Sequence, residues 1–139
     1  MIKYLGSKRT LTPVLGDIAT ASGATSAVDL FTGTTRVAQE LKRRWLFVLA
    51  NDIATYSKVM ADCYIATDAR SSDIAEVLSV LDELNHLPGV RGYFTRTFCE
   101  DSRFFQPKNG ARVDAIREAI ETDYANSWMR PILLTSLML

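Results

Sequence analysis

The sequence predicts an α/β fold with a parallel sheet, and three observations support this prediction. Two short apolar segments, residues 27–31 and 45–50, have the length and the β-branched and aromatic content of buried strands. Each segment ends in small or polar residues, and each is followed by apolar residues at helical spacing. Alternation of strand and helix with mainly apolar strands is typical of a parallel sheet that helices cover on both faces.

The first half of the chain is predicted to alternate between helix and strand. Apolar residues at helical spacing predict a helix over 8–21, and Gly23 follows it as a stop signal. The strand at 27–31 leads into a helix over 36–44, whose last turn carries three cations that suit the helix dipole. The strand at 45–50 leads into a helix that we expect to reach about residue 67.

The second half of the chain is predicted to be mostly helical. A capping signal at Asp73 begins an amphipathic helix that ends before Pro88. Residues 90–109 mix aromatic and basic side chains, and a further helix begins at the end of this segment. A last helical stretch, interrupted by Pro131, runs apolar to Leu139. Such an apolar end predicts that this part packs against something or that the natural protein continues beyond it.

Length and composition are those of an ordinary globular domain, with 139 residues of which 47% are hydrophobic and 23% are charged. Sixteen basic and sixteen acidic residues cancel, which excludes a histone-like binder that depends on overall charge. The apolar stretches are shorter than the roughly 20 residues of a membrane span, and the N-terminus lacks a secretory pattern. Cys63 and Cys99 are too few for a disulfide framework or a metal site. We therefore expect a cytoplasmic protein without a membrane segment.

The end of the first predicted strand has the features of an adenosine pocket. A strand that stops at a small-residue turn and leads into a helix places backbone N–H groups at the carboxyl edge of the sheet. Asp52 ends the second strand, 23 residues after Asp29, where a carboxylate can accept hydrogen bonds from both ribose hydroxyls. Only Gly33 of a dinucleotide fingerprint is present, because Thr34 and Thr35 replace further glycines. A nucleoside without phosphates fits such a turn better; the alternative is an ordinary turn in which Asp52 caps a helix.

The N-terminal residues 2–9 (Ile-Lys-Tyr-Leu-Gly-Ser-Lys-Arg) place an aromatic ring, a glycine and cations ahead of the first helix. Residues 1–44 carry seven Lys and Arg against three Asp and Glu. This basic third of the chain either orients the domain on a polyanion or forms an ordinary solvated helix face.

Three motifs in register resemble the Dam-like, adenine-specific DNA methyltransferases of the alpha group. Residues 3–8 (Lys-Tyr-Leu-Gly-Ser-Lys) match the opening motif of that family, residues 29–33 (Asp-Leu-Phe-Thr-Gly) its first-strand loop, and residues 51–52 (Asn-Asp) the end of its second strand. Residues 92–94 and 109–117 also look like a stretch that many members contain. The resemblance implies a Rossmann-like class I methyltransferase fold, with a partial parallel sheet, flanking helices and a helical insertion.

The resemblance also implies that seven residues bind S-adenosylmethionine, namely Tyr4, Lys8, Asp29, Phe31, Gly33, Asp52 and Ile53. Tyr4 is expected to pack near the cofactor, and Lys8 to bond its carboxylate. The three residues of the first-strand loop are expected to shape the site under the methionine part. Asp52 is expected to hold the ribose, with Ile53 beside the adenine ring. Thr35 departs from the second glycine of the family loop, and its hydroxyl could instead cap the next helix.

The family transfers a methyl group to the exocyclic amine of adenine through an Asp-Pro-Pro-Tyr type motif, and this chain does not contain one. None of its four prolines is next to another. The order of motifs in the family places the missing motif downstream of Leu139. We therefore expect no catalytic residue in this chain, which would be an N-terminal, cofactor-side portion that is inactive alone. We expect as a further partner either a chain that completes it or a second copy, bound through the apolar C-terminal end.

Double-stranded DNA is the partner that the resemblance implies. We expect residues 1–70 to bind the cofactor and residues 71–139 to form a helical, DNA-recognition side that is incomplete at its C-terminus. Four basic residues are candidates for phosphate contacts, namely Arg91, Arg96, Arg103 and Lys108. Aromatic residues between them could stack on bases. The alternative is that these aromatic residues, namely Tyr93, Phe94, Phe98, Phe104 and Phe105, form a core under a long loop.

Two other functions remain open at this point. One is a different adenosine-cofactor enzyme, either a small-molecule methyltransferase or a nucleotide-dependent oxidoreductase. The other is a remnant or interaction module that keeps the fold without the reaction.

Overall fold

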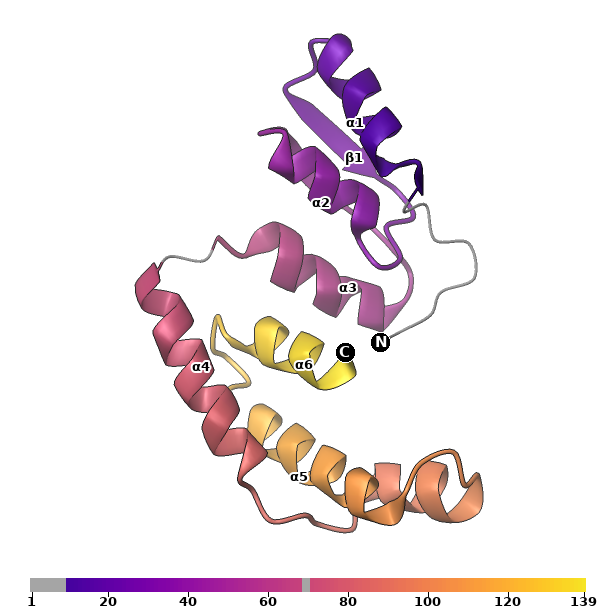
Figure 1. Ribbon diagram of the computed structural model, residues 1–139, viewed down its shortest axis with the longest axis vertical. Coiled ribbons are helices and arrows are strands. Elements are labelled where there is room, and N and C mark those ends of the chain that lie inside the picture. Colours follow the sequence, from indigo (N-terminus) through magenta and orange to yellow (C-terminus); the bar gives the residue numbers. More distant parts are fainter. Residues whose placement is uncertain (1–9, 69–70) are drawn as a thin grey trace. The chain divides into compact units, whose positions relative to one another are not determined.

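The computed structural model describes residues 10–68 and 71–139, and the chain divides into two compact units, Met1–Asp68 and Ala69–Leu139. We call these the first unit and the second unit. Figure 1 shows strands only in the first unit, whereas the described part of the second unit is helical. Among the helices of the described residues, none is long and apolar enough to cross a membrane.

The first unit alternates between helix and strand, as the sequence predicts. Its elements are, in chain order, α1 (Thr12–Ala21), β1 (Ser26–Asp29), α2 (Arg36–Arg43), β2 (Phe47–Ala50), α3 (Thr55–Ala61) and the π-helix η2 (Asp62–Ala66). The two strands pair in parallel, with Ser26 opposite Phe47 and Asp29 opposite Ala50. The parallel arrangement that the sequence predicts is therefore confirmed for this small sheet.

Both strands are shorter than predicted. Leu30 and Phe31 lie beyond β1, because the chain already bends toward the following turn there. Trp45 precedes β2 with a φ of 65°, a left-handed conformation that ends the α2 segment and cannot belong to a strand. Helix α1 begins at Thr12 and not at residue 8, since Pro13 stands in its first turn, where a missing N–H costs nothing.

One face of the sheet is uncovered in the described residues, so the expected cover on both faces is wrong for this part of the chain. Along each strand, exposed and half-buried residues alternate. Val28, Phe47 and Leu49 are more than half exposed. Helix α2 packs against both strands, and its Ala38 and Leu41 are buried. The described elements of the first unit thus supply one covering helix layer for the sheet.

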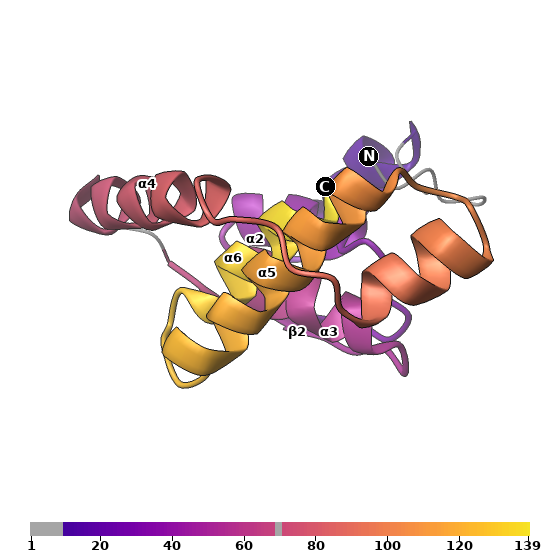
Figure 2. The same ribbon diagram turned by 90° about the horizontal axis from the view of Figure 1, so that it is seen from below.

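The second unit is built on α5. Its elements are α4 (Ser71–Asn85), the π-helix η3 (Thr95–Asp101), α5 (Pro107–Asp123) and α6 (Arg130–Met138). Helix α5 packs against each of the other three, and Figure 1 and Figure 2 both show it beside α6. Ile120 and Leu133 are almost fully buried in this packing. The sequence predicts that Pro131 interrupts the last helix, and this prediction is wrong. Pro131 stands in the first turn of α6, where proline fits.

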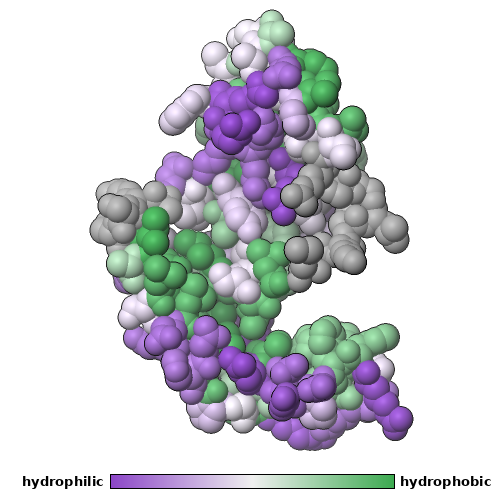
Figure 3. All heavy atoms as spheres, viewed as in Figure 1, coloured by the Kyte–Doolittle hydropathy of each residue, from purple (hydrophilic) through white to green (hydrophobic). Residues whose placement is uncertain are grey.

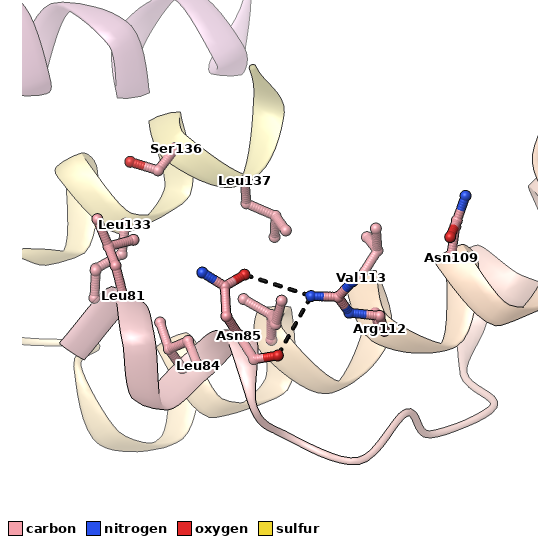
Figure 4. A pocket seen from close by; sticks show the side chains of 10 residues that line it. Leu81, Leu84, Asn85, Asn109, Arg112, Val113, Leu133, Ser136 and Leu137 are labelled. Carbon is pink, nitrogen blue, oxygen red and sulfur yellow. Dashed lines mark hydrogen bonds between the residues drawn. The ribbon is translucent and has the colours of Figure 1, made fainter. Parts of the chain in front are cut away.

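The three long helices of the second unit leave a cavity of about 430 Å³ between them (Figure 4). Leucine and other aliphatic side chains form its walls, and the Arg112 guanidinium lies at one side. Arg112 donates from Nη2 to the backbone oxygen and to Oδ1 of Asn85, at 3.3 and 3.5 Å. Apolar side chains also reach the surface of each unit, for example over α1 and over α4 in Figure 3.

Candidate functional site

The turn between β1 and α2 has an unusual backbone. Gly33 has a φ of 51°, and a Cβ atom built on it would meet nothing within 4 Å, so the space beside this residue is open. Thr35 has a φ of 62°, a conformation that β-branched residues rarely adopt. Its side chain is fully buried, which holds the backbone in this strained state.

The Thr35 hydroxyl does not cap α2, so that expectation is wrong. Thr35 is the N-cap residue, but its side chain makes no capping hydrogen bond, because the left-handed backbone directs the hydroxyl elsewhere. Oγ1 donates to the carbonyl oxygen of Thr34 at 2.7 Å and accepts from Nε2 of Gln39 at 2.7 Å. The departure from glycine at this position is therefore accommodated by a buried local network.

Asp52 ties the ends of the two strands together. Its Oδ2 accepts from the backbone N–H of Gly33 at 2.8 Å, and its Oδ1 accepts from the backbone N–H of Ala54 at 3.0 Å. The hydrogen bonds from Ala54 and Gly33 hold the pKa of Asp52 below its ordinary value, so this carboxylate is ionised at neutral pH. Each oxygen retains a further lone pair beyond the one that its backbone partner uses. Asp52 thus supports the turn and can still accept from a ligand. It does not cap α3 as the alternative interpretation expected, because the N-cap residue of α3 is Ala54 and this helix has no side-chain cap.

Two buried oxygen atoms at the end of β1 lack a hydrogen-bond partner among the described residues. They are Oδ2 of Asp29 and Oγ1 of Thr32. A buried acceptor without a partner is costly, and such atoms in a native fold call for an explanation. Thr32 directly precedes Gly33, beside which the space is open, and a ligand that carries hydrogen-bond donors would satisfy such atoms.

Apolar side chains flank this polar turn. Phe31 is 79% exposed, and Ile53 is fully exposed directly after Asp52. Large apolar side chains that face solvent beside unpaired polar atoms offer a surface for a planar apolar group. The turn therefore combines polar acceptors with apolar contact area.

The structure brings five of the seven predicted cofactor residues to neighbouring strand ends. Asp29, Phe31 and Gly33 lie at or after the end of β1, and Asp52 and Ile53 follow β2. Backbone hydrogen bonds join the two ends, from the N–H of residue 51 to the oxygen of residue 29 at 2.8 Å and from the N–H of residue 32 to the oxygen of residue 51 at 3.0 Å. The other two, at positions 4 and 8, lie outside the described residues.

The sequence does not predict the roles of three polar residues in the first unit. The Thr32 side chain is 7% exposed, and its hydroxyl has no partner among the described residues. Asn51 donates from Nδ2 to the carbonyl oxygen of Leu30 at 3.1 Å and so fastens the chain after β1. Ser57 on α3 is fully buried, and its hydroxyl also has no partner among the described residues. A small polar residue amid the apolar positions of a helix was the available signal for Ser57.

The three basic residues at the end of α2 bind partners within the first unit and do not form a surface of unpaired cations for a polyanion. Lys42 donates from Nζ to the carbonyl oxygens of residues 64, 65 and 67 at 3.3, 2.8 and 2.7 Å, and it pairs with Asp68 at 3.0 Å. Arg43 and Arg44 both pair with Glu40, and their hydrogen bonds lower the pKa of Glu40 to about 2. This part of the basic third is thus an internally paired helix face.

The four basic DNA-binding candidates differ in their surroundings. Arg91 is paired with Glu100 through two hydrogen bonds of 2.8 and 2.6 Å, which hold the pKa of Glu100 below its ordinary value. Arg96, Arg103 and Lys108 are exposed and have no ion pair within 4.0 Å among the described residues. Three of the candidates therefore have no ion-pair partner among the described residues, although the charge of Arg96 also helps to lower the pKa of Glu100.

The aromatic side chains of the same segment do not form a closed core, so that alternative is wrong for three of them. Tyr93, Phe104 and Phe105 are more than half exposed, whereas Phe94 and Phe98 are half-buried. The rings of Phe94 and Phe98 lie 4.9 Å apart, and Phe94 also contacts Phe105 at 5.3 Å. The half-buried ring of Phe94 thus packs against the exposed ring of Phe105, in the same segment that carries the exposed basic residues.

Within residues 10–68 and 71–139, no group of three or more His, Cys, Asp or Glu side chains could hold a metal ion.

Comparison with known proteins identifies the family of the chain. A family model described as D12 class N6 adenine-specific DNA methyltransferase matches residues 4–139. The chain is 30% identical over 129 residues to a protein of Neisseria lactamica named Type II methyltransferase M.NlaIII, and the match covers 86% of this chain and 38% of that relative. The chain thus spans well under half the length of the relative, and no solved structure matches it significantly. Since the family model covers nearly every residue, the chain belongs to the D12 class N6 adenine-specific DNA methyltransferase family.

Proposed function

We propose that this chain is the cofactor-binding and DNA-contacting part of a site-specific DNA adenine methyltransferase. Such an enzyme transfers a methyl group from S-adenosylmethionine to the exocyclic amine of adenine. The observation that carries the proposal is the hydrogen bond from Gly33 to Asp52, which unites the two strand ends. It supports a nucleoside site at the carboxyl edge of the sheet, where α/β folds bind such ligands. We also propose that the protein works in the cytoplasm.

The residues at the strand ends fit S-adenosylmethionine. The remaining lone pairs of Asp52 would accept the two ribose hydroxyls, and Ile53 would contact the adenine ring. Asp29 and Thr32 provide acceptors whose buried oxygens have no partner in the described residues, and the ammonium group of the methionine part offers donors of the right kind. Phe31 supplies apolar contact, and the open space at Gly33 admits the ligand. When bound, S-adenosylmethionine supplies an electrophilic methyl group.

Tyr4 and Lys8 complete the proposed cofactor site. We propose that Tyr4 packs against the cofactor and that Lys8 neutralises its carboxylate. An ammonium group at this position would balance a ligand that carries a carboxylate near Asp29 and Asp52. Both proposals concern residues that precede the described part of the chain.

The exposed part of segment 91–108 supports a DNA contact. Arg96, Arg103 and Lys108 would bind phosphates, because their charges have no ion-pair partner among the described residues. Exposed rings between them would stack on or wedge between bases. The pairing of Arg91 with Glu100 favours a supporting role for Arg91.

The reaction itself needs groups that the sequence of this chain does not contain. Its prolines stand singly at positions 13, 88, 107 and 131, so it has no Asp-Pro-Pro-Tyr motif. We therefore propose that the chain binds its ligands without transferring the methyl group, and that a completing segment or chain supplies the motif.

Calorimetry tests the cofactor part of the proposal. The chain is titrated with S-adenosylmethionine, with S-adenosylhomocysteine and with a nicotinamide dinucleotide. We expect binding of the first two ligands and none of the third, because Thr34 and Thr35 replace the glycines that a dinucleotide-binding turn uses next to a pyrophosphate. Preference for the dinucleotide would contradict the methyltransferase assignment of the site and favour an oxidoreductase.

A further inference from the structure

Asp114 holds the base of the aromatic and basic segment through four hydrogen bonds. Its Oδ1 accepts from the backbone N–H of Phe94 at 2.8 Å. Its Oδ2 accepts from the backbone N–H groups of Gly92 and Thr95 at 3.0 and 2.8 Å, and from the Thr95 hydroxyl at 2.6 Å. One carboxylate on α5 thus accepts from three backbone amides and one hydroxyl of a segment that lies about 20 residues earlier in the chain.

The carboxylate acts as an N-terminal cap supplied from another helix. The first amides of a helix lack intrahelical acceptors, and an anion there is favourable. Burial tends to raise the pKa of Asp114, but the hydrogen bonds from Thr95, Phe94 and Gly92 outweigh it, so the pKa lies below its ordinary value. Because Asp114 occupies these amides, a DNA phosphate has no access to them.

Close backbone approach makes this attachment tight. A Cβ atom on Gly92 would lie 2.7 Å from Cγ and Oδ1 of Asp114, and one on Gly110 would lie 2.4 Å from Sγ of Cys99. The backbone N–H of Val90 donates to the oxygen of Ala111 at 2.9 Å. The segment is therefore fixed to the first turns of α5 at its start and along η3.

The far part of the segment is joined to the same base. The backbone N–H groups of Phe104 and Phe105 donate to the carbonyl oxygen of Phe98 at 2.9 and 3.2 Å. Thr95, which Asp114 binds, is followed by the exposed Arg96. The hydrogen bonds at Asp114 thus determine where the exposed rings and cations lie.

We propose that Asp114 is a positioning residue for DNA binding: it fixes segment 92–106 in the conformation that presents Arg96, Arg103 and the exposed aromatic rings to the duplex. This inference rests on the proposed DNA contact. Asp114 itself does not touch DNA, because all of its described hydrogen bonds point into the protein.

The test measures DNA binding of the full 139-residue chain by fluorescence anisotropy with a labelled duplex at several salt concentrations. The variants are Asp114→Asn and Gly92→Ala, with Asp123→Asn as the control, because Asp123 is an exposed carboxylate on the same helix. Asp114→Asn replaces an acceptor with a donor that faces other donors. Gly92→Ala pushes the segment away from the intact carboxylate. Affinity for S-adenosylmethionine and the helical circular dichroism are measured on each variant.

We expect both variants to lose at least tenfold in DNA affinity, with a salt slope smaller by about 2 because roughly two phosphate contacts are lost. Cofactor affinity should not change, because that site lies in the first unit. The control should behave as the wild type. DNA affinity that survives in Asp114→Asn and Gly92→Ala would overturn the inference and leave the proposed function intact. A wild-type chain that binds no DNA would overturn the proposed DNA contact, and the inference with it.

Helical circular dichroism separates positioning from simple loss of folding. Positioning predicts weaker DNA binding in variants that keep the wild-type helical signal and the wild-type cofactor affinity. A loss of DNA binding that occurs only together with a loss of the helical signal would contradict a positioning role for Asp114.

Discussion

Two loops of this protein are each held by one aspartate, and they differ in whether the buried polar atoms near that aspartate have hydrogen-bond partners. At the strand ends, Asp52 accepts from Gly33 and Ala54, while Oδ2 of Asp29 and Oγ1 of Thr32 are buried without a partner in the part of the chain that the structure describes. At the base of segment 92–106, Asp114 accepts four hydrogen bonds, and the nearby Thr95 hydroxyl is satisfied.

This difference distinguishes a loop that can bind a ligand from a loop that positions other groups. A polar network that is satisfied stabilises one conformation, whereas unpaired buried acceptors cost free energy until a donor arrives. The first loop therefore has the properties of a ligand site, and the second those of a scaffold that carries other binding groups. Four predictions test this comparison, and they run from the largest expected effect to the smallest.

Asp52→Ala should give the largest effect on cofactor binding. We expect affinity for S-adenosylmethionine to fall by roughly tenfold or more, since the ribose hydroxyls and the Gly33 amide lose their acceptor. Calorimetry measures the change, and Asp123→Ala is the control for a lost surface charge. Unchanged affinity would show that the ribose lies elsewhere and that Asp52 only supports the turn.

A matched pair of substitutions compares the two loops directly. Thr95→Val removes a hydroxyl that donates to Asp114, so it should lower the free energy of unfolding by about 1 kcal/mol. Thr32→Val removes a buried hydroxyl that has no partner within residues 10–68 and 71–139, so it should leave the stability of the ligand-free protein unchanged or raise it.

The effects of the two substitutions on cofactor affinity should be the reverse of their effects on stability. Thr32→Val should weaken S-adenosylmethionine binding several-fold, and Thr95→Val should not affect it. Urea unfolding and calorimetry on both variants provide the measurements. Equal losses of stability in the two variants would show that Thr32 has a partner in the folded protein and would remove the distinction between the loops.

Lys8→Ala should weaken cofactor binding in a salt-dependent manner. If the ammonium group meets the cofactor carboxylate, the loss should be larger at low salt than at high salt, because ions screen the attraction. Titrations at two or more salt concentrations measure this. A loss that does not depend on salt would indicate packing instead of a charge contact.

The pairing of Glu40 with Arg43 and Arg44 should give a small pH effect on stability. These two arginines lower the folded-state pKa of Glu40 from 4.5 to about 2. The stabilisation is therefore present above pH 4.5 and is lost as the pH falls toward 2. Urea unfolding at pH 5 and below pH 3 should show a smaller decline for Glu40→Gln than for the wild type. An equal decline in both proteins would place the acid sensitivity in other carboxylates.

Much of the fold and part of the site could be predicted from local patterns. The parallel pairing of β1 and β2 follows from two apolar segments that each precede a helical pattern, and the polar residues after them must then meet at one edge. The helical second unit follows from apolar spacing and capping signals. Element boundaries were less predictable, because Pro13, Pro107 and Pro131 stand in first turns that tertiary packing selects.

The sequence by itself determined the family, the strand order and the neighbourhood of Asp29, Gly33 and Asp52, because these depend on short-range patterns of apolar, small and acidic residues. Only the tertiary structure decided that Glu100 neutralises Arg91, that Thr32 is buried with no partner among the residues described and that Asp114 holds the chain at Gly92. The physical reason is that parallel strands bring their carboxyl ends to one edge of the sheet, which a local pattern predicts. The contacts of Arg91 with Glu100 and of Gly92 with Asp114 depend instead on how the helical segments pack, and no local spacing encodes that packing.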